Sequence, residues 1–410
     1  SKSSEYNYLI LREVFFMNWN PTWICPANDL GDPAAVFGTS FVFEKKITLA
    51  NLTITAMGVY EARLNGRRVG QFVMAPGWTS YHKRLQYQKY DITDLLTNDK
   101  NEVEVTVGKG WYRSPLPGWL GCAYQDELRS RPCGLAAQIT LTFEDGSSKI
   151  LSTDESWKVS DGPVRFSEIY DGEIYDSAKT PLLDQPVTMF DGPTDTLILQ
   201  QGEEVCEQER LAVKKVFVTP NGETVLDFGQ NMTGYVELFV NAKAGDCVDL
   251  SFAEVMDKEG NFYTENYRGA KAQYHYICSD GVQTWHPSLT FYGFRYIRIN
   301  DFPGGIDCVK PENFTAITVH SNMKRTGFLS SSNTLLNQLF SNIIWGQKGN
   351  FLDVPTDCPQ RDERLGWTGD AQVFVRTACL NYDAEKFFTK WLADLASDPH
   401  DDGYVGHVIP

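Results

Sequence analysis

The chain has 410 residues, enough for two to four domains that each bury a core of their own. Hydrophobic residues make up 42% of it and charged residues 22%, ordinary proportions for a globular protein that exclude disordered and fibrous classes. Its formal net charge of −16 argues against nucleic acid or an anionic membrane as a partner, whereas a neutral sugar is compatible with it.

Cysteine spacing and hydropathy bear on where the protein works. The nine cysteines are dispersed, without a CxxC pair or a close cluster with histidine, so we expect free thiols and no metal site. Calcium is possible, but no stretch marks a site for it, and we expect no required cofactor. The first residues lack an apolar leader, and no apolar run approaches the ~18 residues of a membrane span. We therefore expect a cytoplasmic protein without a membrane partner.

The first half of the chain shows the pattern of short strands. Residues 1–40 have little periodicity and are interpreted as a lead-in that packs along another domain. Strand-like stretches follow from Phe41, and Asn65-Gly66 is a hairpin signal because both positions tolerate positive φ. Residues 69–73 are expected to continue the hairpin on its far side. Strands at this spacing indicate a β-sandwich.

Two boundaries divide the chain after the first sandwich. Residues 180–212 are rich in Pro, Asp, Gln and Glu and are interpreted as a connector, so the first sandwich with its connector spans 41–212. A second all-β unit, with long alternating stretches, spans 213–320. The remaining residues, 321–410, change to a helical pattern.

Three helices are predicted in this last part, because apolar residues recur there at three- and four-residue spacing. The predicted helices are Leu335–Ile344, Ala371–Ala378 and Ala384–Ala396. Their expected N-terminal caps are Ser331 with Ser332, Asp370 and Asp383, respectively.

A highly charged segment, residues 350–370, separates the first two helices. It holds two arginines, a tryptophan and five carboxylates, which is too much charge for a packed core segment. Pro355 and Pro359 bias the residues before them away from helical angles, so the segment is expected to be a loop on a helical scaffold. The carboxylates are Asp353, Asp357, Asp362, Glu363 and Asp370.

Glu363 stands close in sequence to Arg361, Arg364 and Trp367. A carboxylic acid held near an aromatic wall can donate a proton at neutral pH, while a carboxylate in a more polar setting stays ionised. Two such groups are the equipment of glycoside hydrolysis. The alternative is a network of caps and salt bridges at a helix entrance. A thiol nucleophile at Cys358 is not expected, since no histidine is nearby in sequence.

The stretch from Asp357 to Asp370, DCPQRDERLGWTGD, closely resembles the signature of the bacterial α-L-rhamnosidases of glycoside hydrolase family 78. Other stretches along the chain resemble the same family, so that the resemblance covers nearly the whole sequence. These stretches are Gly58–Gly66, Pro76–Tyr81, Tyr90–Leu96, Gly108–Tyr112, Ile169–Asp176, Asp227–Gly234 and His286–Tyr296.

The resemblance implies a multidomain fold and a site. The fold would comprise two β-sandwich domains, jelly-roll and concanavalin-like, followed by the first helices of an (α/α)6 barrel. Glu363 would be the general acid, Asp357, Arg361 and Trp367 would line the rhamnosyl subsite, and Asp370 would assist in binding. Family members invert the anomeric configuration, and their general base, a glutamate on a later barrel loop, would lie outside this chain.

The resemblance implies hydrolysis of terminal α-L-rhamnosyl residues from plant glycosides or polysaccharides, so the expected partner is a rhamnose-containing glycoside or oligosaccharide. About ninety residues follow position 320, too few for a barrel of twelve helices. Either the chain is part of a longer enzyme, or it is a carbohydrate-binding or scaffold fragment without turnover, which would expose the apolar faces of its helices. We favour the longer enzyme. A third alternative is another (α/α)6 glycoside hydrolase, and a homodimer is a possible assembly.

Aromatic residues of the first sandwich have two interpretations. They could form a platform on which sugar rings stack, or they could fill the sandwich core and its loops. The core is the preferred interpretation. The residues concerned are Trp78, Tyr81, Trp111, Tyr112 and Trp119.

Overall fold

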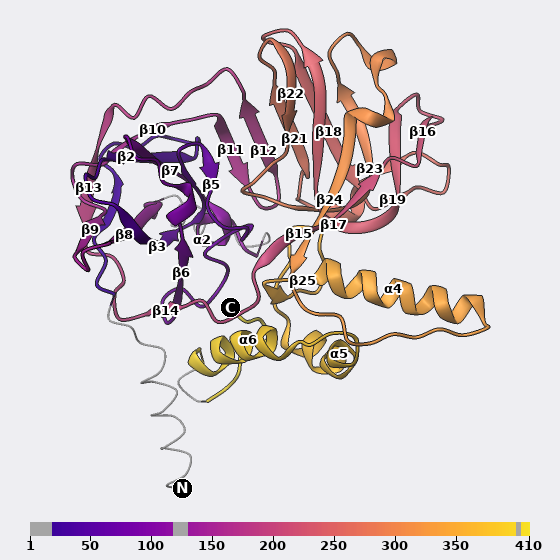
Figure 1. The fold of residues 1–410 in the computed structure, drawn as a ribbon. Coiled ribbons are helices and arrows are strands. Elements are labelled where there is room, and N and C mark those ends of the chain that lie inside the picture. The colour runs from indigo at the N-terminus through magenta and orange to yellow at the C-terminus, as the bar shows by residue number, and fades with distance from the viewer. Residues whose placement is uncertain (1–18, 118–129, 399–402) are drawn as a thin grey trace, which may run out of the picture.

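The computed structural model describes residues 19–117, 130–398 and 403–410. Two β-rich bodies stand side by side, and three helices lie beneath them, with α6 under the first body and α4 under the second (Figure 1). This arrangement confirms the predicted fold class of two β domains followed by a helical start.

The first body is built on a 12-stranded sheet with the order β14-β6-β3-β8-β1-β13-β10-β2-β7-β4-β5, in which β9 pairs with β8. Apolar residues of both halves, such as Ile54 on β3 and Val105 on β7, belong to one buried cluster, so the sheet curls around a shared core. The short helices η1 (Thr93–Leu95) and α2 (Gly110–Arg113) lie between its strands. The strands are β1 (Trp23–Pro26), β2 (Ala35–Phe41), β3 (Ile47–Met57), β4 (Val59–Leu64), β5 (Arg67–Arg68), β6 (Leu85–Asp91), β7 (Asn101–Gly108), β8 (Gly134–Phe143), β9 (Ser148–Ser152), β10 (Lys158–Asp161), β13 (Gln185–Phe190) and β14 (Leu197–Leu199).

The predicted hairpin at Asn65-Gly66 is confirmed. Both residues have positive φ, 53° and 75°, and they join β4 to β5. The far strand is shorter than expected, because it ends at Arg68 and residues 69–73 leave the sheet. Val69 and Val73 are nevertheless buried, and their amides donate to Ala62 O and Val205 O, so their apolar pattern reflects packing against the core outside a regular strand.

Two stretches that are irregular in sequence pattern contain strands. The lead-in contributes β1 and β2, and the connector contributes β13, β14 and β15 (Val205–Ala212). Strand β1 pairs antiparallel with β13, so the two stretches complete each other in the first sheet. Neither shows a clear alternation of apolar and polar residues, and their partners are distant in sequence, which is why a local pattern could not reveal them.

The second body is built on a 10-stranded sheet with the order β11-β12-β21-β18-β23-β17-β24-β15, in which β16 and β22 pair with β17. Strands β11 and β12 precede the connector in sequence yet join this second sheet, where β12 runs parallel to β21. The strands are β11 (Val164–Glu168), β12 (Gly172–Asp176), β15 (Val205–Ala212), β16 (Lys215–Val218), β17 (Thr224–Ala242), β18 (Cys247–Ala253), β21 (Gln273–Ile277), β22 (Gly281–Trp285), β23 (Tyr292–Asp301) and β24 (Phe314–Ser321). Smaller elements are β19 (Val255–Met256), β20 (Phe262–Tyr263), η2 (Glu265–Tyr267), η3 (Ile306–Cys308) and η4 (Pro311–Asn313).

The three predicted helices are present as α4 (Thr334–Asn350), α5 (Thr368–Asn381) and α6 (Glu385–Ser397). Their caps differ from the prediction. Asn333 caps α4 by accepting hydrogen bonds from the amides of the second and third helical residues, while Ser331 and Ser332 lie outside the helix. Helix α5 begins two residues before Asp370, which therefore lies in its first turn. A negative charge there interacts favourably with the helix dipole. Helix α6 follows Ala384 rather than Asp383.

The outward faces of these helices carry large apolar side chains in contact with solvent, of which Leu335 and Val373 are the most exposed, at 79% and 82%. The 410-residue chain therefore exposes the apolar helix faces that we expected for a fragment. Among the described residues, no helix combines the length and the apolarity that crossing a bilayer requires. The exposed positions are Leu335, Leu336 and Leu339 on α4, Val373 and Leu380 on α5, and Leu392 on α6.

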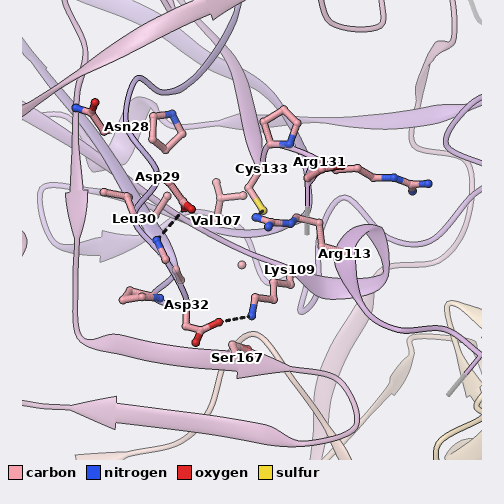
Figure 2. A pocket seen from close by; sticks show the side chains of 18 residues that line it. Asn28, Asp29, Leu30, Asp32, Val107, Lys109, Arg113, Arg131, Cys133 and Ser167 are labelled. Carbon is pink, nitrogen blue, oxygen red and sulfur yellow. Dashed lines mark hydrogen bonds and ion pairs between the residues drawn. The ribbon is translucent and has the colours of Figure 1, made fainter. Parts of the chain in front are cut away.

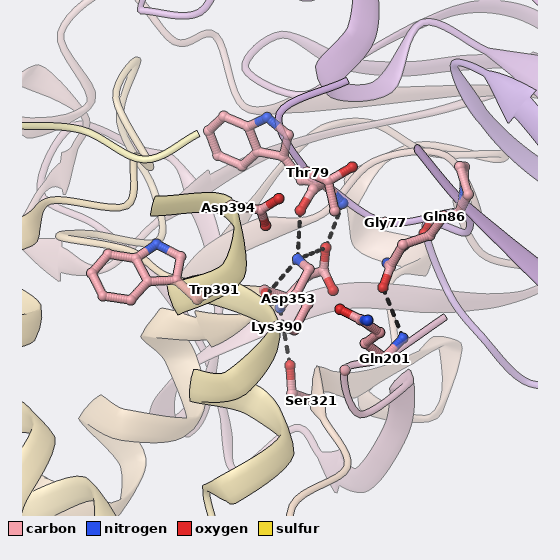
Figure 3. A network of polar contacts seen from close by, with 12 residues as sticks. Gly77, Thr79, Gln86, Gln201, Ser321, Asp353, Lys390, Trp391 and Asp394 are labelled. Atoms are coloured by element: carbon pink, nitrogen blue, oxygen red, sulfur yellow. Dashed lines mark hydrogen bonds and ion pairs between the residues drawn. The ribbon is translucent and has the colours of Figure 1, made fainter. Parts of the chain in front are cut away.

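A buried polar network docks α6 against the first body (Figure 3). Lys390 on α6 is fully buried and donates to Asp353 Oδ2 at 2.8 Å, and the same carboxylate accepts from the backbone amide of Trp78. Asp353 has a φ of 68° and its own amide donates to Ser321 Oγ at 3.0 Å. A Cβ at Gly77 would lie 2.8 Å from Asp353 Oδ2, so only glycine permits this approach.

Candidate active site

The charged loop lies between α4 and α5, as predicted, and begins with the small hairpin of β25 (Phe351–Leu352) and β26 (Val354–Pro355). It is held in place by Arg364, which has a φ of 56° and is only 1% exposed. All four of its described hydrogen bonds go to backbone carbonyls, including Ile169 O at 3.0 Å and Phe291 O at 2.8 Å in the second body. Burial lowers the pKa of this guanidinium. Arg364 is therefore an internal support of the loop.

Among the residues that the structure describes, three side chains donate hydrogen bonds to the Glu363 carboxylate. Arg361 Nε and Arg268 Nη2 each lie 2.8 Å from Oε2, and Trp367 Nε1 lies 3.0 Å from Oε1. The residue is only 8% exposed. Both oxygens thus accept from donors of fixed direction, and Trp367 contributes its indole N–H to the site.

Asp357 lies on the other side of Arg361. Its Oδ2 accepts from Arg361 Nη2 at 3.0 Å, and its Oδ1 accepts from the backbone amide of Leu365 at 3.0 Å. Burial is the main cause that raises the pKa of this carboxyl. Arg361 therefore bridges the two carboxylates, and the loop brings Asp357, Arg361, Glu363 and Trp367 together in one cluster.

Cys358 completes a group with Asp357 and Glu363 whose possible ligand atoms lie within 4.8 Å of one another. Burial and the neighbouring Asp357 raise the pKa of its thiol to about 12, so the thiolate needed for nucleophilic or metal chemistry is disfavoured. The two carboxylates already accept from guanidinium groups, which would compete with a cation. The group is better suited to hydrogen bonding than to metal binding.

Asp370 lies apart from this cluster, on the exposed first turn of α5. It shares with Asp357 the lining of a pocket of about 340 Å³ between α4 and α5, whose other walls include Phe351 and Phe374. The structure thus places Asp370 near the loop but not among the residues that contact Glu363.

Two residues that contact the loop do not stand out in the sequence. The Tyr170 hydroxyl, between β11 and β12, donates to the backbone carbonyl of Glu363 at 2.7 Å. Arg268, directly after η2, reaches the Glu363 carboxylate itself. Tyr170 lies in one of the stretches that resemble the family, which was a usable signal, whereas Arg268 lies in none of them.

Of the aromatic residues of the first body, the two tryptophans belong to its buried core, as the preferred interpretation expects, while the two tyrosines are only partly buried. Trp78 and Trp111 are each 6% exposed and stack on one another, with ring centroids 5.7 Å apart. Tyr81 and Tyr112 meet edge to face at 5.9 Å, and they line a pocket of about 690 Å³ together with the two tryptophans. Trp119 lies outside the described residues.

Figure 2 shows a separate polar pocket of about 370 Å³ on the first body. Lys109 Nζ pairs there with Asp32 Oδ1 at 3.1 Å, and Arg113 Nη1 donates to Cys133 Sγ at 3.6 Å. A larger pocket of about 650 Å³ shares Asp32, Lys109 and Arg113 with it and reaches Asp362 on the charged loop. The two pockets form a polar surface that leads from the first body to the loop.

Comparison with known sequences accounts for most of the chain. A model of the α-L-rhamnosidase N-terminal domain matches residues 45–213, and one of the bacterial α-L-rhamnosidase concanavalin-like domain matches 217–320. A model of the bacterial α-L-rhamnosidase 6 hairpin glycosidase domain matches 324–410.

Curated relatives and solved structures carry the same description. An α-L-rhamnosidase of Formosa agariphila is 38% identical over 387 residues, which are 90% of this chain and 41% of the relative. The crystal structure of native α-L-rhamnosidase from Aspergillus terreus is 39% identical with a TM-score of 0.88, and covers 95% of this chain and 47% of that one. The Streptomyces avermitilis α-L-rhamnosidase complexed with L-rhamnose is 38% identical with a TM-score of 0.86, over 92% of this chain and 37% of that one.

The chain spans less than half the length of each of these relatives. Within that span, the similarity runs through both β bodies and into the helices that carry the charged loop. The chain belongs to the bacterial α-L-rhamnosidase family, glycoside hydrolase family 78.

Proposed function

We propose that this chain forms the front part of an α-L-rhamnosidase that hydrolyses terminal α-L-rhamnosyl residues of rhamnose-containing glycosides or oligosaccharides. The observation that carries the proposal is that hydrogen bonds fix the Glu363 carboxylate in place, and that Arg361 bridges it to Asp357. The Streptomyces avermitilis α-L-rhamnosidase, whose structure matches most of this chain, forms a complex with L-rhamnose, which supports the choice of sugar.

In the proposed mechanism, Glu363 is the general acid. The bond between the anomeric carbon and the glycosidic oxygen breaks, its electron pair goes to that oxygen, and the oxygen takes the proton of Glu363. A water molecule gives a proton to a general base outside this chain, and its oxygen bonds to the anomeric carbon from the opposite face, which inverts the configuration. No cofactor takes part, because both proton transfers are carboxylate chemistry.

Asp357, Arg361 and Trp367 are proposed to bind the rhamnosyl ring. Their polar atoms are arranged around Glu363 and already form hydrogen bonds, so a sugar hydroxyl entering the site would exchange with existing partners. Asp370 is proposed to assist from the neighbouring pocket that it lines with Asp357.

The test is release of rhamnose from p-nitrophenyl α-L-rhamnoside by the 410-residue chain and by a polypeptide expressed to the stop codon of its gene. Activity only in the extended polypeptide is expected, because an inverting mechanism needs both carboxylates. Activity in neither would contradict the proposed function and favour a binding or scaffold role. Activity in the short chain would mean that its second carboxylate is already present.

A further inference from the structure

Arg268 has an unusual backbone conformation for a side-chain-bearing residue. Its φ is 54° and its ψ is −111°, outside the regions that non-glycine residues readily occupy. Such conformations cost of order 1–3 kcal/mol and persist where the surroundings over-determine them, often at functional sites. The turn that holds Arg268 follows η2 in the second body, 95 residues before Glu363 in sequence.

The side chain of Arg268 spans two adjacent carboxylates of the charged loop. Its Nε lies 2.7 Å from Asp362 Oδ1, and its Nη2 lies 2.8 Å from Glu363 Oε2. The following residue is Gly269, where a Cβ would lie 2.8 Å from Asp362 Oδ2, so the turn comes as close to the loop as a glycine allows. The strained turn therefore serves to bring one guanidinium onto the loop.

Arg268 covers the outer side of a carboxyl that is otherwise enclosed. The Glu363 side chain is 11% exposed and that of Arg268 is 45% exposed. Arg361 and Trp367, the other two donors to this carboxylate, come from the loop itself, so Arg268 is the donor from a different domain. Arg268 thus links the charged loop to the second body beside Glu363, the residue that would transfer a proton.

We propose that Arg268 is a positioning residue for Glu363, contributed by the concanavalin-like domain. The inference rests on the proposed role of Glu363 as general acid. When that acid gives its proton to the leaving oxygen, negative charge develops on its carboxylate, and a guanidinium already in place stabilises the charge without reorganisation. Arg268 also fixes the direction of Oε2, which keeps the carboxyl within reach of the glycosidic oxygen.

This role predicts a dependence on the leaving group. Cleavage of an α-L-rhamnosyl disaccharide needs protonation of an alkoxide leaving group, whereas p-nitrophenolate leaves with little assistance. In the polypeptide expressed to the stop codon of its gene, Arg268→Met should lower kcat on the disaccharide by about tenfold or more and kcat on the p-nitrophenyl substrate by less than about threefold, with KM little changed. Arg268→Lys keeps the positive charge but loses the planar guanidinium that reaches two carboxylates at once, so it should recover part of the loss in kcat.

Arg298→Met is the matched control. This arginine of the same domain pairs with Glu223 at 2.8 Å, is 33% exposed, and makes none of the described contacts with the loop. Equal losses on both substrates in Arg268→Met, or no loss on either, would overturn the proposal, and so would a Lys variant no better than Met. An inactive parent polypeptide would overturn the proposed function first, and this inference with it. If Glu363→Gln lowered kcat equally on both substrates, the assignment of Glu363 as the general acid would be contradicted.

Discussion

At the scale of single residues, the two arginines of the charged loop have different kinds of partner. Arg361 pairs with Asp357 and Glu363, while Arg364, three positions later, turns away and binds backbone carbonyls. The sequence shows both arginines beside Glu363 and does not distinguish them, because the carbonyls of Ile169 and Phe291 that Arg364 binds are distant in sequence. The two interpretations of the segment, a site and a salt-bridge network, describe the same contacts.

Trp367 offers a test of the indole N–H separately from the aromatic face. Trp367→Phe keeps an aromatic ring but removes the donor that lies 3.0 Å from Glu363 Oε1. We expect kcat on an α-L-rhamnosyl disaccharide to fall about tenfold, with little change in the melting temperature. Trp345→Phe on α4, whose ring lies under Lys348, is the control and should leave kcat unchanged. Unchanged kcat in Trp367→Phe would show that this hydrogen bond does not position the acid.

At the scale of elements, the carboxylate segment contributes to two structures at once. Asp353, at its start, belongs to the docking network of α6, and Glu363, further on, belongs to the candidate site. In the sequence both are members of one run of five carboxylates, with nothing local to separate them. Only the partners, which lie in the first body and on α6, distinguish the structural carboxylate from the candidate catalytic one.

Removing one partner of the buried pair of Lys390 and Asp353 should strongly destabilise the folded protein. Lys390→Met leaves the Asp353 carboxylate buried without its ammonium partner, which typically costs about 3–5 kcal/mol. We expect a large drop in the midpoint of urea unfolding. Lys45→Met removes an exposed pair with Asp145 and should have little effect. Equal midpoints in the two variants would contradict the importance of this network.

Asp394 on α6 makes the same interface sensitive to pH. Burial is the main cause that raises the pKa of this carboxyl from 3.8 to about 6, against the opposing effects of Lys390 and Arg84. Between these values the folded protein holds a proton that the unfolded chain releases, so the carboxyl's contribution to stability falls as pH rises.

The stability of the wild type relative to Asp394→Asn should therefore fall by roughly 1–3 kcal/mol between about pH 4 and pH 6. Urea unfolding of both proteins across this range measures the difference, in which the titration of groups that do not interact with Asp394 cancels. A relative stability that is constant, or that rises with pH, would contradict the shift.

At the scale of the whole molecule, the order of domains could be predicted from sequence, but the exchange of strands between them could not. Strand alternation, the hairpin at Asn65-Gly66 and the helical spacing after residue 321 are local, and each produced the expected type of element. Strands β11 and β12 join the second sheet across a long stretch of chain, and β1 pairs with β13 over a similar distance. Arg268 reaches the loop by the same long-range packing, which no local pattern encodes.

The exposed apolar faces of α4, α5 and α6 lead to a prediction about the short chain. As a 410-residue polypeptide it should bind a hydrophobic dye and self-associate more than the polypeptide expressed to the stop codon of its gene. Dye fluorescence and light scattering at matched concentrations check this. Replacing Val373 and Leu380 by Gln should reduce both signals in the short chain. Equal signals from the two polypeptides would contradict the proposal that this chain is the front part of a longer enzyme.

The most direct test of the account is the turnover of Glu363→Gln on substrates with good and poor leaving groups, in the polypeptide expressed to the stop codon of its gene. We expect kcat on an α-L-rhamnosyl disaccharide to fall by roughly 10² or more with KM little changed, and kcat on p-nitrophenyl α-L-rhamnoside to fall much less. Glu265→Gln, an exposed carboxylate in η2, is the control. Retained turnover of the disaccharide by Glu363→Gln would place the proton donor elsewhere and contradict the account.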